Sequence, residues 1–247
     1  MPVINTNVAA IKARGNFAKV QREMDQSIAR LSSGKRINSA HDDASGLAIS
    51  GRLESQVRGL NMQIQSNKNG QAMVDSMEGS MQEISGILQR MRELAVQASS
   101  GIATAADRGY LDTEMEALAD EIQAISVNTK FNETVLFTGA TFSFFADINV
   151  TGTAIITTTL GMETSTLSVE AADVEIGTVA EAQSAINDID NAISTLAEKR
   201  GIMGAIGNRM DHIVDNLTNV VANTVSAQSR IQDADYAVET TALTRAT

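Results

Sequence analysis

The amino-acid sequence predicts a mainly α protein, an elongated rod of long antiparallel, coiled-coil-like helices with a small β insert in the middle of the chain. Apolar residues recur at alternating steps of three and four over long stretches, the spacing of coiled-coil seams. Aromatic residues make up only 3% of the 247 residues, so the apolar content is almost entirely aliphatic. Aliphatic side chains suffice for thin helical stripes, whereas compact globular cores usually use aromatic bulk.

The N-terminal segment contains the first, short heptad run and predicts one helix. The run consists of Phe17, Val20, Met24, Ile28 and Leu31. A polar stretch, residues 32–38, follows it and contains Gly34, which is free to take a positive φ. The sequence therefore predicts that this helix ends in a linker.

Two long heptad runs predict two long helices, over residues 43–99 and 180–231. In the first, a second apolar row (Val74, Met81, Leu88, Ala95) predicts contact with more than one partner helix. Polar residues interrupt the two seams at Asn67 and Gln71 and at Arg200. A helix over residues 43–99 would be roughly 85 Å long, so the two long helices are expected to pair antiparallel in a rod.

A third helix is predicted within residues 105–128, beside the long pair. Its apolar positions are Met115, Leu118, Ile122 and Ile125. In the second long run, Gly201, Gly204 and Gly207 recur every three residues. That spacing predicts close approach of a neighbouring helix over small residues.

The segment 131–177 is different in kind and predicts short strands with turns. It is rich in Thr, Phe, Ile and Val, and Gly139, Gly152 and Gly161 interrupt it. β-Branched and aromatic runs of this type favour strands, here within 142–146, 155–159 and 167–169.

Composition argues against several classes of function. The chain carries 19 Lys and Arg against 30 Asp and Glu, a net charge of −11, which opposes binding to nucleic acid or to anionic membranes. It has no cysteine, and its two histidines, His41 and His212, have no ligand-type neighbour. We therefore expect no metal, no cofactor, no catalytic residues and no enzymatic activity. Charged residues near the N-terminus leave no apolar region of a cleaved secretory signal.

Six stretches of the sequence resemble bacterial flagellin. Arg30 to Ser50, RLSSGKRINSAHDDASGLAIS, resembles the N-terminal signature of that family. The others are VINTN at 3–7, LQRMRELAVQAS at 88–99, TKFNETVLF at 129–137, GAIGNRMDHIVDNLTN at 204–219 and SRIQDADYAVETTALTRA at 229–246. Together they anchor both helical halves, whereas the β insert matches no family motif.

The resemblance implies a structural subunit that polymerises into the bacterial flagellar filament for swimming motility. The alternatives are a flagellar hook–filament junction protein or another secreted helical filament subunit. It further implies an extracellular location, export without a cleaved signal peptide, and no binding to nucleic acid or membranes. The implied partners are other copies of the chain, the flagellar export apparatus, a chaperone, and cap and junction proteins.

The resemblance also implies a domain organisation. The expected segments are an N-terminal core helix and linker (1–40), the two halves of a rod domain (41–130 and 178–235), a variable β insert (131–177) and the start of a C-terminal core helix (236–247). The loop 32–38 resembles the link between the core helix and the rod, with the acidic segment Asp233–Tyr236 as its counterpart on the returning chain. Family members continue with a further apolar heptad helix, so the chain is expected to be truncated, either naturally or by trimming. The first helix is then expected to lack its partner, and the chain is expected to stay soluble rather than extend filaments.

Finally, the resemblance implies a partner-binding surface. The family's outer helices are recognised by an animal Toll-like receptor through residues that match Gln89, Arg90 and Leu94, with Glu114 in the acidic position on the next helix. Leu94 lies in the heptad row, so packing is at least as good an explanation for it as direct contact. Arg90 and Glu114 are equally compatible with a surface ion pair between helices.

Overall fold

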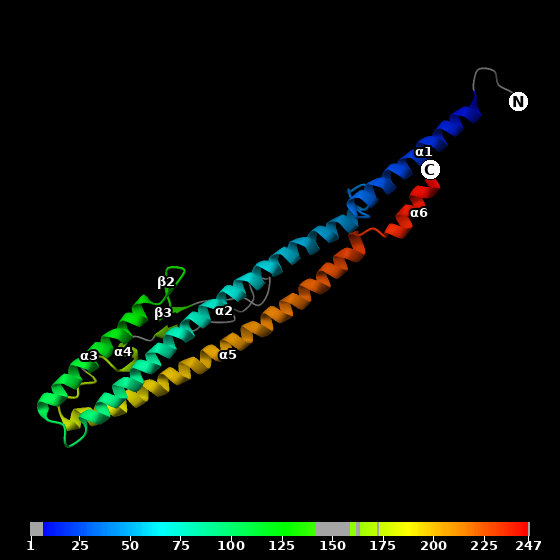
Figure 1. Ribbon diagram of the computed structural model, residues 1–247. Helices are drawn as coiled ribbons and strands as arrows, with labels where there is room; N and C mark the ends of the chain where they lie inside the picture. The colour runs from blue at the N-terminus through cyan, green and yellow to red at the C-terminus, as the bar shows by residue number, and fades with distance from the viewer. Residues whose placement is uncertain (1–6, 142–158, 162–163, 172, 247) are drawn as a thin grey trace. The chain divides into compact units, whose positions relative to one another are not determined.

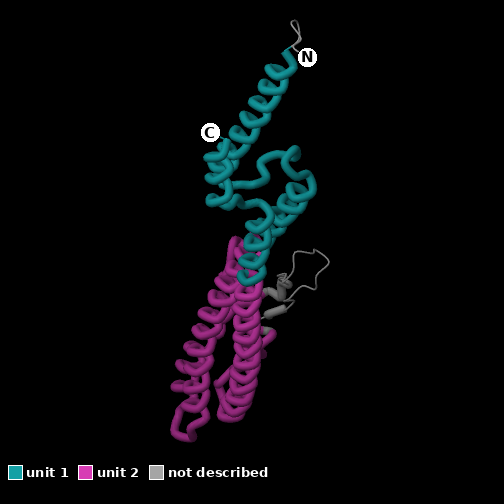
Figure 2. The backbone as a smooth tube through the Cα atoms, turned by 90° about the vertical axis from the view of Figure 1, so that its right-hand side faces the viewer, with its two compact units in different colours: residues 1–61, 218–247 teal, residues 62–217 magenta. Residues whose placement is uncertain are grey.

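The computed structural model describes residues 7–141, 159–161, 164–171 and 173–246, and it confirms a mainly α fold (Figure 1). The helices among these residues are α1 (Val8–Ser33), α2 (Ala44–Ala98), α3 (Ala105–Asn128), α4 (Thr164–Leu167), α5 (Val179–Gln232) and α6 (Tyr236–Ala246). The chain divides into two compact units (Figure 2). Unit 1 comprises Met1–Asn61 with Thr218–Thr247, and unit 2 comprises Met62–Leu217. None of the described helices is long and apolar enough to cross a membrane.

In unit 2, α2 and α5 lie side by side and run antiparallel, as the heptad runs predict (Figure 1). Arg92 Nε donates to Asp190 Oδ1 at 2.6 Å near the α2–α3 turn. Gln71 Nε2 donates to Asp211 Oδ1 at 2.5 Å much further along. The later residue of α2 thus contacts the earlier residue of α5, so the two helices run in opposite directions.

The third predicted helix, α3, returns along α2 after a tight turn. Thr104 caps it: the Thr104 hydroxyl accepts from the Asp107 backbone N–H at 3.2 Å, and the Asp107 carboxylate accepts from the Thr104 N–H at 2.9 Å. This reciprocal box satisfies backbone donors that the first helical turn leaves unpaired. At the other end of α3, Thr129 Oγ1 donates to Ser80 Oγ on α2 at 3.3 Å. These contacts fix α3 antiparallel to α2.

The three helices of unit 2 enclose an aliphatic core. Both apolar rows of α2 are buried, which confirms that this helix packs against more than one partner. The large apolar side chains of these three helices in unit 2 that are at most 2% exposed are Met77, Met81, Ile84, Leu88, Met91 and Leu94 on α2, Met115 and Ile122 on α3, and Ile189, Leu196, Met203 and Met210 on α5. Burial of such side chains contributes about 1.5–3 kcal/mol each, so the seams carry most of the stability of unit 2.

The central insert begins with two short antiparallel strand pairs. Strand β1 (Lys130–Phe131) pairs with β2 (Thr134–Val135), and β3 (Thr138–Thr141) pairs with β4 (Thr159–Gly161). Asn132 and Glu133 take positive φ values of 48° and 65° in the first turn, the geometry that suits tight hairpins. The strands expected within 142–146 and through most of 155–159 lie outside the described residues.

The expectation of a strand at 167–169 is wrong. Residues Thr164–Leu167 form the short helix α4 instead, and Ser168 has a positive φ of 55°. Gln123 of α3 holds this turn, because its Oε1 accepts from the Thr164 N–H at 3.2 Å and from the Thr164 hydroxyl at 3.0 Å. Leu167 and Val169 are buried as anchors of an irregular segment. Their spacing reflects anchoring to the core rather than strand alternation.

The expectation of close helix approach over Gly201, Gly204 and Gly207 is also wrong within the described chain. A Cβ built at each of these glycines would have no heavy atom within 4 Å. The seam at this level is filled by Met203 and Met210. The glycines lie beside the seam and leave open space.

In unit 1, the linker after α1 forms a clasp with the segment after α5. Gly34 has a φ of 69°, as expected for a helix-ending glycine. Its carbonyl accepts from the Ala234 N–H at 3.0 Å, and Lys35 forms an isolated antiparallel bridge with Asp233. Arg36 Nη2 donates to the Ile231 carbonyl at 2.6 Å, which satisfies an unpaired group at the end of α5. These contacts show that the segment after α1 and the segment after α5 lie side by side.

The expectation that α1 lacks a partner is wrong for its C-terminal half, because α6 packs against it. Arg30 Nη1 donates to Glu239 Oε1 at 2.9 Å, and the Glu239 side chain is only 8% exposed. The Tyr236 hydroxyl donates to the Leu31 carbonyl at 3.3 Å. Further toward its N-terminus, α1 exposes apolar side chains, with Phe17 at 71%.

Two carboxylates organise the start of α2. Asp42 Oδ2 accepts from the backbone N–H groups of Asn38 at 3.1 Å and Ser39 at 2.9 Å. These hydrogen bonds lower the pKa of Asp42 to about 2, with the Ser39 backbone bond as the largest cause. Asp43 Oδ1 accepts from the Gly46 N–H at 2.9 Å, and this bond is the main reason that the pKa of Asp43 is lowered. Asp43 therefore caps α2, whereas Asp42 closes the turn that precedes this helix.

Candidate functional site

The four residues singled out by the sequence lie on α2 and α3 of unit 2, near the turn that joins these helices. Gln89 and Arg90 are exposed on α2, and Glu114 is exposed on α3. Leu94 is 0% exposed and belongs to the aliphatic core. Three of the four side chains thus form one surface, here called the α2–α3 patch, and Leu94 packs behind it.

An ion-pair cluster organises the α2–α3 patch. Arg90 Nε and Nη2 lie 2.9 Å and 2.8 Å from Glu114 Oε1, and Arg90 Nη1 donates to Glu93 Oε2 at 3.1 Å. Hydrogen bonding to Glu114, followed by that to Glu93, raises the pKa of Arg90. The side chains of Arg90 and Glu114 are 48% and 44% exposed. The surface ion pair is therefore present, and both of its side chains are open to solvent.

Arg92 provides a useful contrast two residues further along α2. Its guanidinium is 44% exposed and pairs across the other seam with Asp190 of α5. Hydrogen bonding to Asp190 raises the pKa of Arg92 and lowers the pKa of the Asp190 carboxyl. Arg90 and Arg92 are thus equally exposed arginines on different faces of α2.

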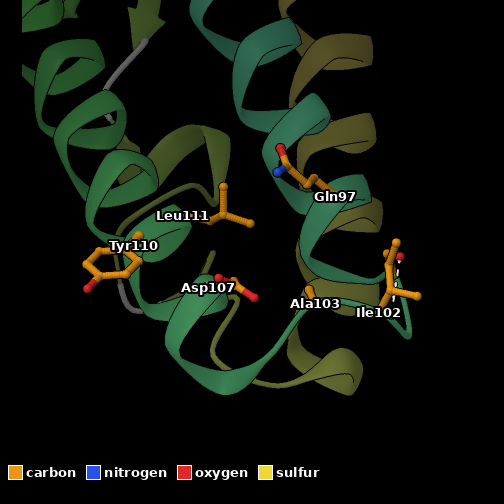
Figure 3. Close-up of a pocket in the computed structure, with 7 residues that line it drawn as sticks. Gln97, Ile102, Ala103, Asp107, Tyr110 and Leu111 are labelled. Carbon is orange, nitrogen blue, oxygen red and sulfur yellow. Dashed lines mark hydrogen bonds between the residues drawn. The ribbon is translucent and has the colours of Figure 1, made fainter.

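A groove lies at the turn between α2 and α3 (Figure 3). It has a volume of about 440 Å³ and is lined by Gln97, Ser100, Ile102, Ala103, Asp107, Tyr110 and Leu111. Gln97 of α2 and Leu111 of α3 point toward each other, whereas Ile102 and Tyr110 lie on opposite outer sides and point away from that space (Figure 3). We call this feature the tip groove.

Sequence reasoning did not find the tip groove. Ile102 and Tyr110 lie outside the heptad runs, within the segment GIATAADRGY of small and polar residues. The signal available in the sequence was one large apolar side chain on each side of the start of α3, both outside any heptad pattern.

At the α2–α3 patch the charged side chains are paired with one another. No group of three or more His, Cys, Asp or Glu side chains that could hold a metal ion occurs within the described ranges. The strongest polar feature, the Arg90 cluster, is a paired surface network rather than a set of titratable groups converging in a pocket. A fork-shaped guanidinium beside a carboxylate suits recognition of a protein surface.

Comparison with known proteins agrees with the helical halves of the chain. Residues 4–141 match the family described as the bacterial flagellin N-terminal helical region. Residues 186–247 match the bacterial flagellin C-terminal helical region. Both matched regions contain the motifs on which the resemblance rests.

Similar individual proteins cover nearly the whole chain. A flagellin of Halalkalibacterium halodurans is 35% identical over 98% of this chain and 90% of its own length. The flagellar filament core protein flaB2 of Brachyspira hyodysenteriae is 34% identical over 95% of this chain and 87% of its own length.

Solved structures show the same fold. The crystal structure of Bacillus cereus flagellin has a TM-score of 0.55 and 27% identity, covering 66% of this chain and 94% of that chain. A hook-associated protein of Vibrio parahaemolyticus has a TM-score of 0.63 and covers 78% of this chain and 100% of that chain. At 17% identity the latter shows the fold alone. The two family regions and the near-complete relatives lead to one conclusion: this chain belongs to the bacterial flagellins, the structural subunits of flagellar filaments.

Proposed function

We propose that the full gene product to which this chain belongs polymerises with copies of itself into an extracellular flagellar filament that drives swimming. The observation that carries the proposal is the match of both helical halves to flagellins over nearly the whole chain. A filament needs contacts between two different surfaces of the subunit, because such contacts repeat without closing. Long antiparallel helices offer many such lateral surfaces.

The domain roles follow the family pattern. Residues 1–40 and 236–247 contribute to the filament core, residues 41–130 and 178–235 form the rod domain, and residues 131–177 form the variable insert. Packing of α6 on α1, through the buried Glu239 and its bond with Arg30, supports pairing of the two core segments. The clasp between Gly34 and Ala234 supports a shared linker between core and rod.

Export proceeds through the flagellar export apparatus without a cleaved signal peptide, and a chaperone and the cap and junction proteins handle the subunit. The composition suits passage of an unfolded chain, because it has no cysteine to form disulfides and few aromatic residues. The net charge of −11 also disfavours adsorption to anionic surfaces on the way.

The filament role is tested by expressing the full gene product in a normally motile bacterial species whose own flagellin genes have been deleted. We expect filaments on the cells and restored swimming. A matched control is the Ile213→Asp variant, which places a charge against the core cluster and should prevent folding of the rod. Secreted, folded protein that never forms filaments would contradict the proposal.

We further propose that monomeric subunits are recognised by an animal Toll-like receptor through the α2–α3 patch. The supporting observation is the fixed pairing of Arg90 with Glu114, which presents a preorganised donor and acceptor to a partner. Gln89 is exposed beside them, whereas Leu94 acts by supporting α2 from the core. In a filament the same face is covered by a neighbouring subunit, so only the monomer is recognised.

Binding of the monomer to the isolated receptor ectodomain tests this second role. We expect Arg90→Ala to weaken binding by roughly 5- to 150-fold, which corresponds to about 1–3 kcal/mol, with an unchanged thermal midpoint. Arg92→Ala is the matched control, because Arg92 is similarly exposed but pairs toward α5. Equal affinities of the Arg90→Ala variant and the unmodified protein would contradict the assignment, as would an unmodified monomer that does not bind.

A further inference from the structure

Helix α1 exposes an apolar row along one of its faces. Phe17, Val20, Met24 and Ile28 recur at steps of three and four residues, so their side chains lie on one side of the helix. Phe17 is 71% exposed, Ile28 47% and Val20 40%, and Met24 is half-buried. We call these four residues the α1 row. Single exposed apolar residues are ordinary, whereas a continuous exposed row marks an interaction surface.

Helix α6 packs against a different side of α1. That contact is centred on Ser27, the one buried residue of this fully described helix, and on the bond from Arg30 to Glu239. Val20 is the member of the α1 row that also lines the groove between the two helices. Contact with α6 therefore leaves most of the α1 row open.

The N-terminal half of α1 has a charge opposite to that of the whole chain. The net charge of −11 is a sum over all 247 residues, and it opposes membrane binding only on average. Residues 8–22 contain no acidic residue and four cations, which are Lys12, Arg14, Lys19 and Arg22. Among the residues that the structure describes, Lys19 alone of these four has an acidic partner, because its Nζ lies 3.7 Å from Glu23 Oε1. Exposed charges are screened beyond about 8 Å at physiological ionic strength, so a surface touching this end of α1 meets mainly these cations.

Two of the cations are placed as in helices that lie on a lipid surface. With 3.6 residues per helical turn, Lys12 and Arg14 flank the α1 row on opposite sides. Their long aliphatic stems let the charged ends reach a headgroup layer while the apolar row enters the boundary of the acyl chains.

The combination of an apolar row and flanking cations identifies the kind of partner. A nucleic acid would use the cations but leave the apolar row in water, and an uncharged protein groove would use the row but not the cations. An anionic lipid surface uses both, which is the pattern of a basic amphipathic helix. We propose that α1 binds the surface of an anionic phospholipid bilayer, with the α1 row at the acyl boundary and Lys12 and Arg14 at the headgroup phosphates. This binding concerns the single, unassembled chain and does not depend on the filament role.

A tryptophan reporter tests this contact, because the chain has no Trp. Residues 1–247 carrying Phe17→Trp are mixed with vesicles of equal parts phosphatidylglycerol and phosphatidylcholine, and with vesicles of phosphatidylcholine alone. We expect the fluorescence emission to move to shorter wavelength with the anionic vesicles, since the indole leaves water, and to move much less with the neutral ones. Raising the salt from about 50 mM to about 0.5 M should reverse the shift, because salt screens the attraction. Tyr110→Trp, at a position that is 78% exposed in unit 2, is the matched control and should keep its emission with both vesicles.

Vesicle sedimentation with further variants separates the apolar contribution from the charged one. Phe17→Ala should weaken binding to the anionic vesicles at least about tenfold. Lys12→Gln combined with Arg14→Gln should weaken it roughly 30-fold. Ile102→Ala and Lys68→Gln are the matched controls, because they remove an exposed apolar and an exposed cationic side chain outside α1, and they should bind like the unmodified chain. All of these variants should keep the unfolding midpoint, since the altered side chains are exposed.

Three results would overturn the inference. The first is unchanged emission of the Phe17→Trp variant with anionic vesicles. The second is an equal shift with phosphatidylcholine alone, which would remove any role for the cations. The third is a shift that grows with protein concentration without lipid, which would assign the α1 row to a second copy of the chain. None of these results bears on the filament role, which is tested by filament formation itself.

Discussion

Leu94→Ala is the perturbation that separates packing from recognition in the α2–α3 patch. The Leu94 side chain is 0% exposed and belongs to the core of unit 2. Truncation removes three buried carbon atoms, worth about 2.4 kcal/mol at ~0.8 kcal/mol each. The cavity left behind adds to this, so the expected loss in the free energy of unfolding is about 3–4 kcal/mol. In a domain of this size that corresponds to a fall of about 10 °C in the thermal midpoint.

Thermal and urea unfolding followed by far-ultraviolet circular dichroism measure this loss. Leu94→Met is the matched control, because it conserves volume and should cost less than about 1.5 kcal/mol. The folded Leu94→Ala monomer should still bind the receptor, since Arg90 and Glu114 remain in place. A stability equal to that of the unmodified protein, together with a large loss of binding, would show that Leu94 is a contact residue and refute the packing argument.

Four further predictions concern the linker and the helices. Asp42 has a pKa of about 2 in the fold, against an ordinary value of 3.8. Its contribution to the free energy of unfolding is therefore present above about pH 4 and is lost as the pH falls toward about 2. Asp42→Asn should flatten the pH dependence of the unfolding midpoint between these two pH values. Gly204→Ala should raise the free energy of unfolding by about 0.5–1 kcal/mol, because the added methyl group meets open space in a helix. Gly46→Ala should lower it, since the methyl group would lie 2.5 Å and 2.6 Å from side-chain atoms. Glu239→Ala should cost about 1–3 kcal/mol in urea unfolding and free α6 from α1, because it leaves the partly buried Arg30 without its acceptor.

The sequence predicts the fold well where a long heptad pattern on one helix packs against a long heptad pattern on another. The heptad runs over 43–99 and 180–231 become α2 and α5 with boundaries within a residue of those expected. The second apolar row on α2 predicts the second neighbour, α3, correctly. Such long amphipathic patterns have no alternative structure that buries them equally well.

The errors arise where a local pattern has more than one physical use. Leu167 and Val169 alternate like strand residues, yet they anchor an irregular segment whose direction Gln123 sets from a distant helix. The glycines near residue 204 look like a close-packing motif, yet their open side faces no described atom within 4 Å. The spacing of residues along the chain does not reveal a distant hydrogen-bond partner, nor which side of a helix has no neighbouring atoms.

The candidate site also has one part that the sequence predicts and one part that it does not. The pairing of Arg90 with Glu114 was foreseen as one of two alternatives, because opposite charges on adjacent helices suggest it, and the structure shows it. The tip groove was not foreseen, since it depends on the turn between α2 and α3, with Ile102 and Tyr110 on opposite outer sides (Figure 3). Its apolar residues are too few to form a periodic pattern.

The central claim is that this chain is the repeating subunit of a flagellar filament. Electron cryomicroscopy of filaments purified from cells that make only the full gene product of this sequence tests it most directly. The account predicts a single repeating subunit in which α2 and α5 run antiparallel with α3 beside them. Cells that secrete the folded protein but carry no filament built from it would contradict the claim.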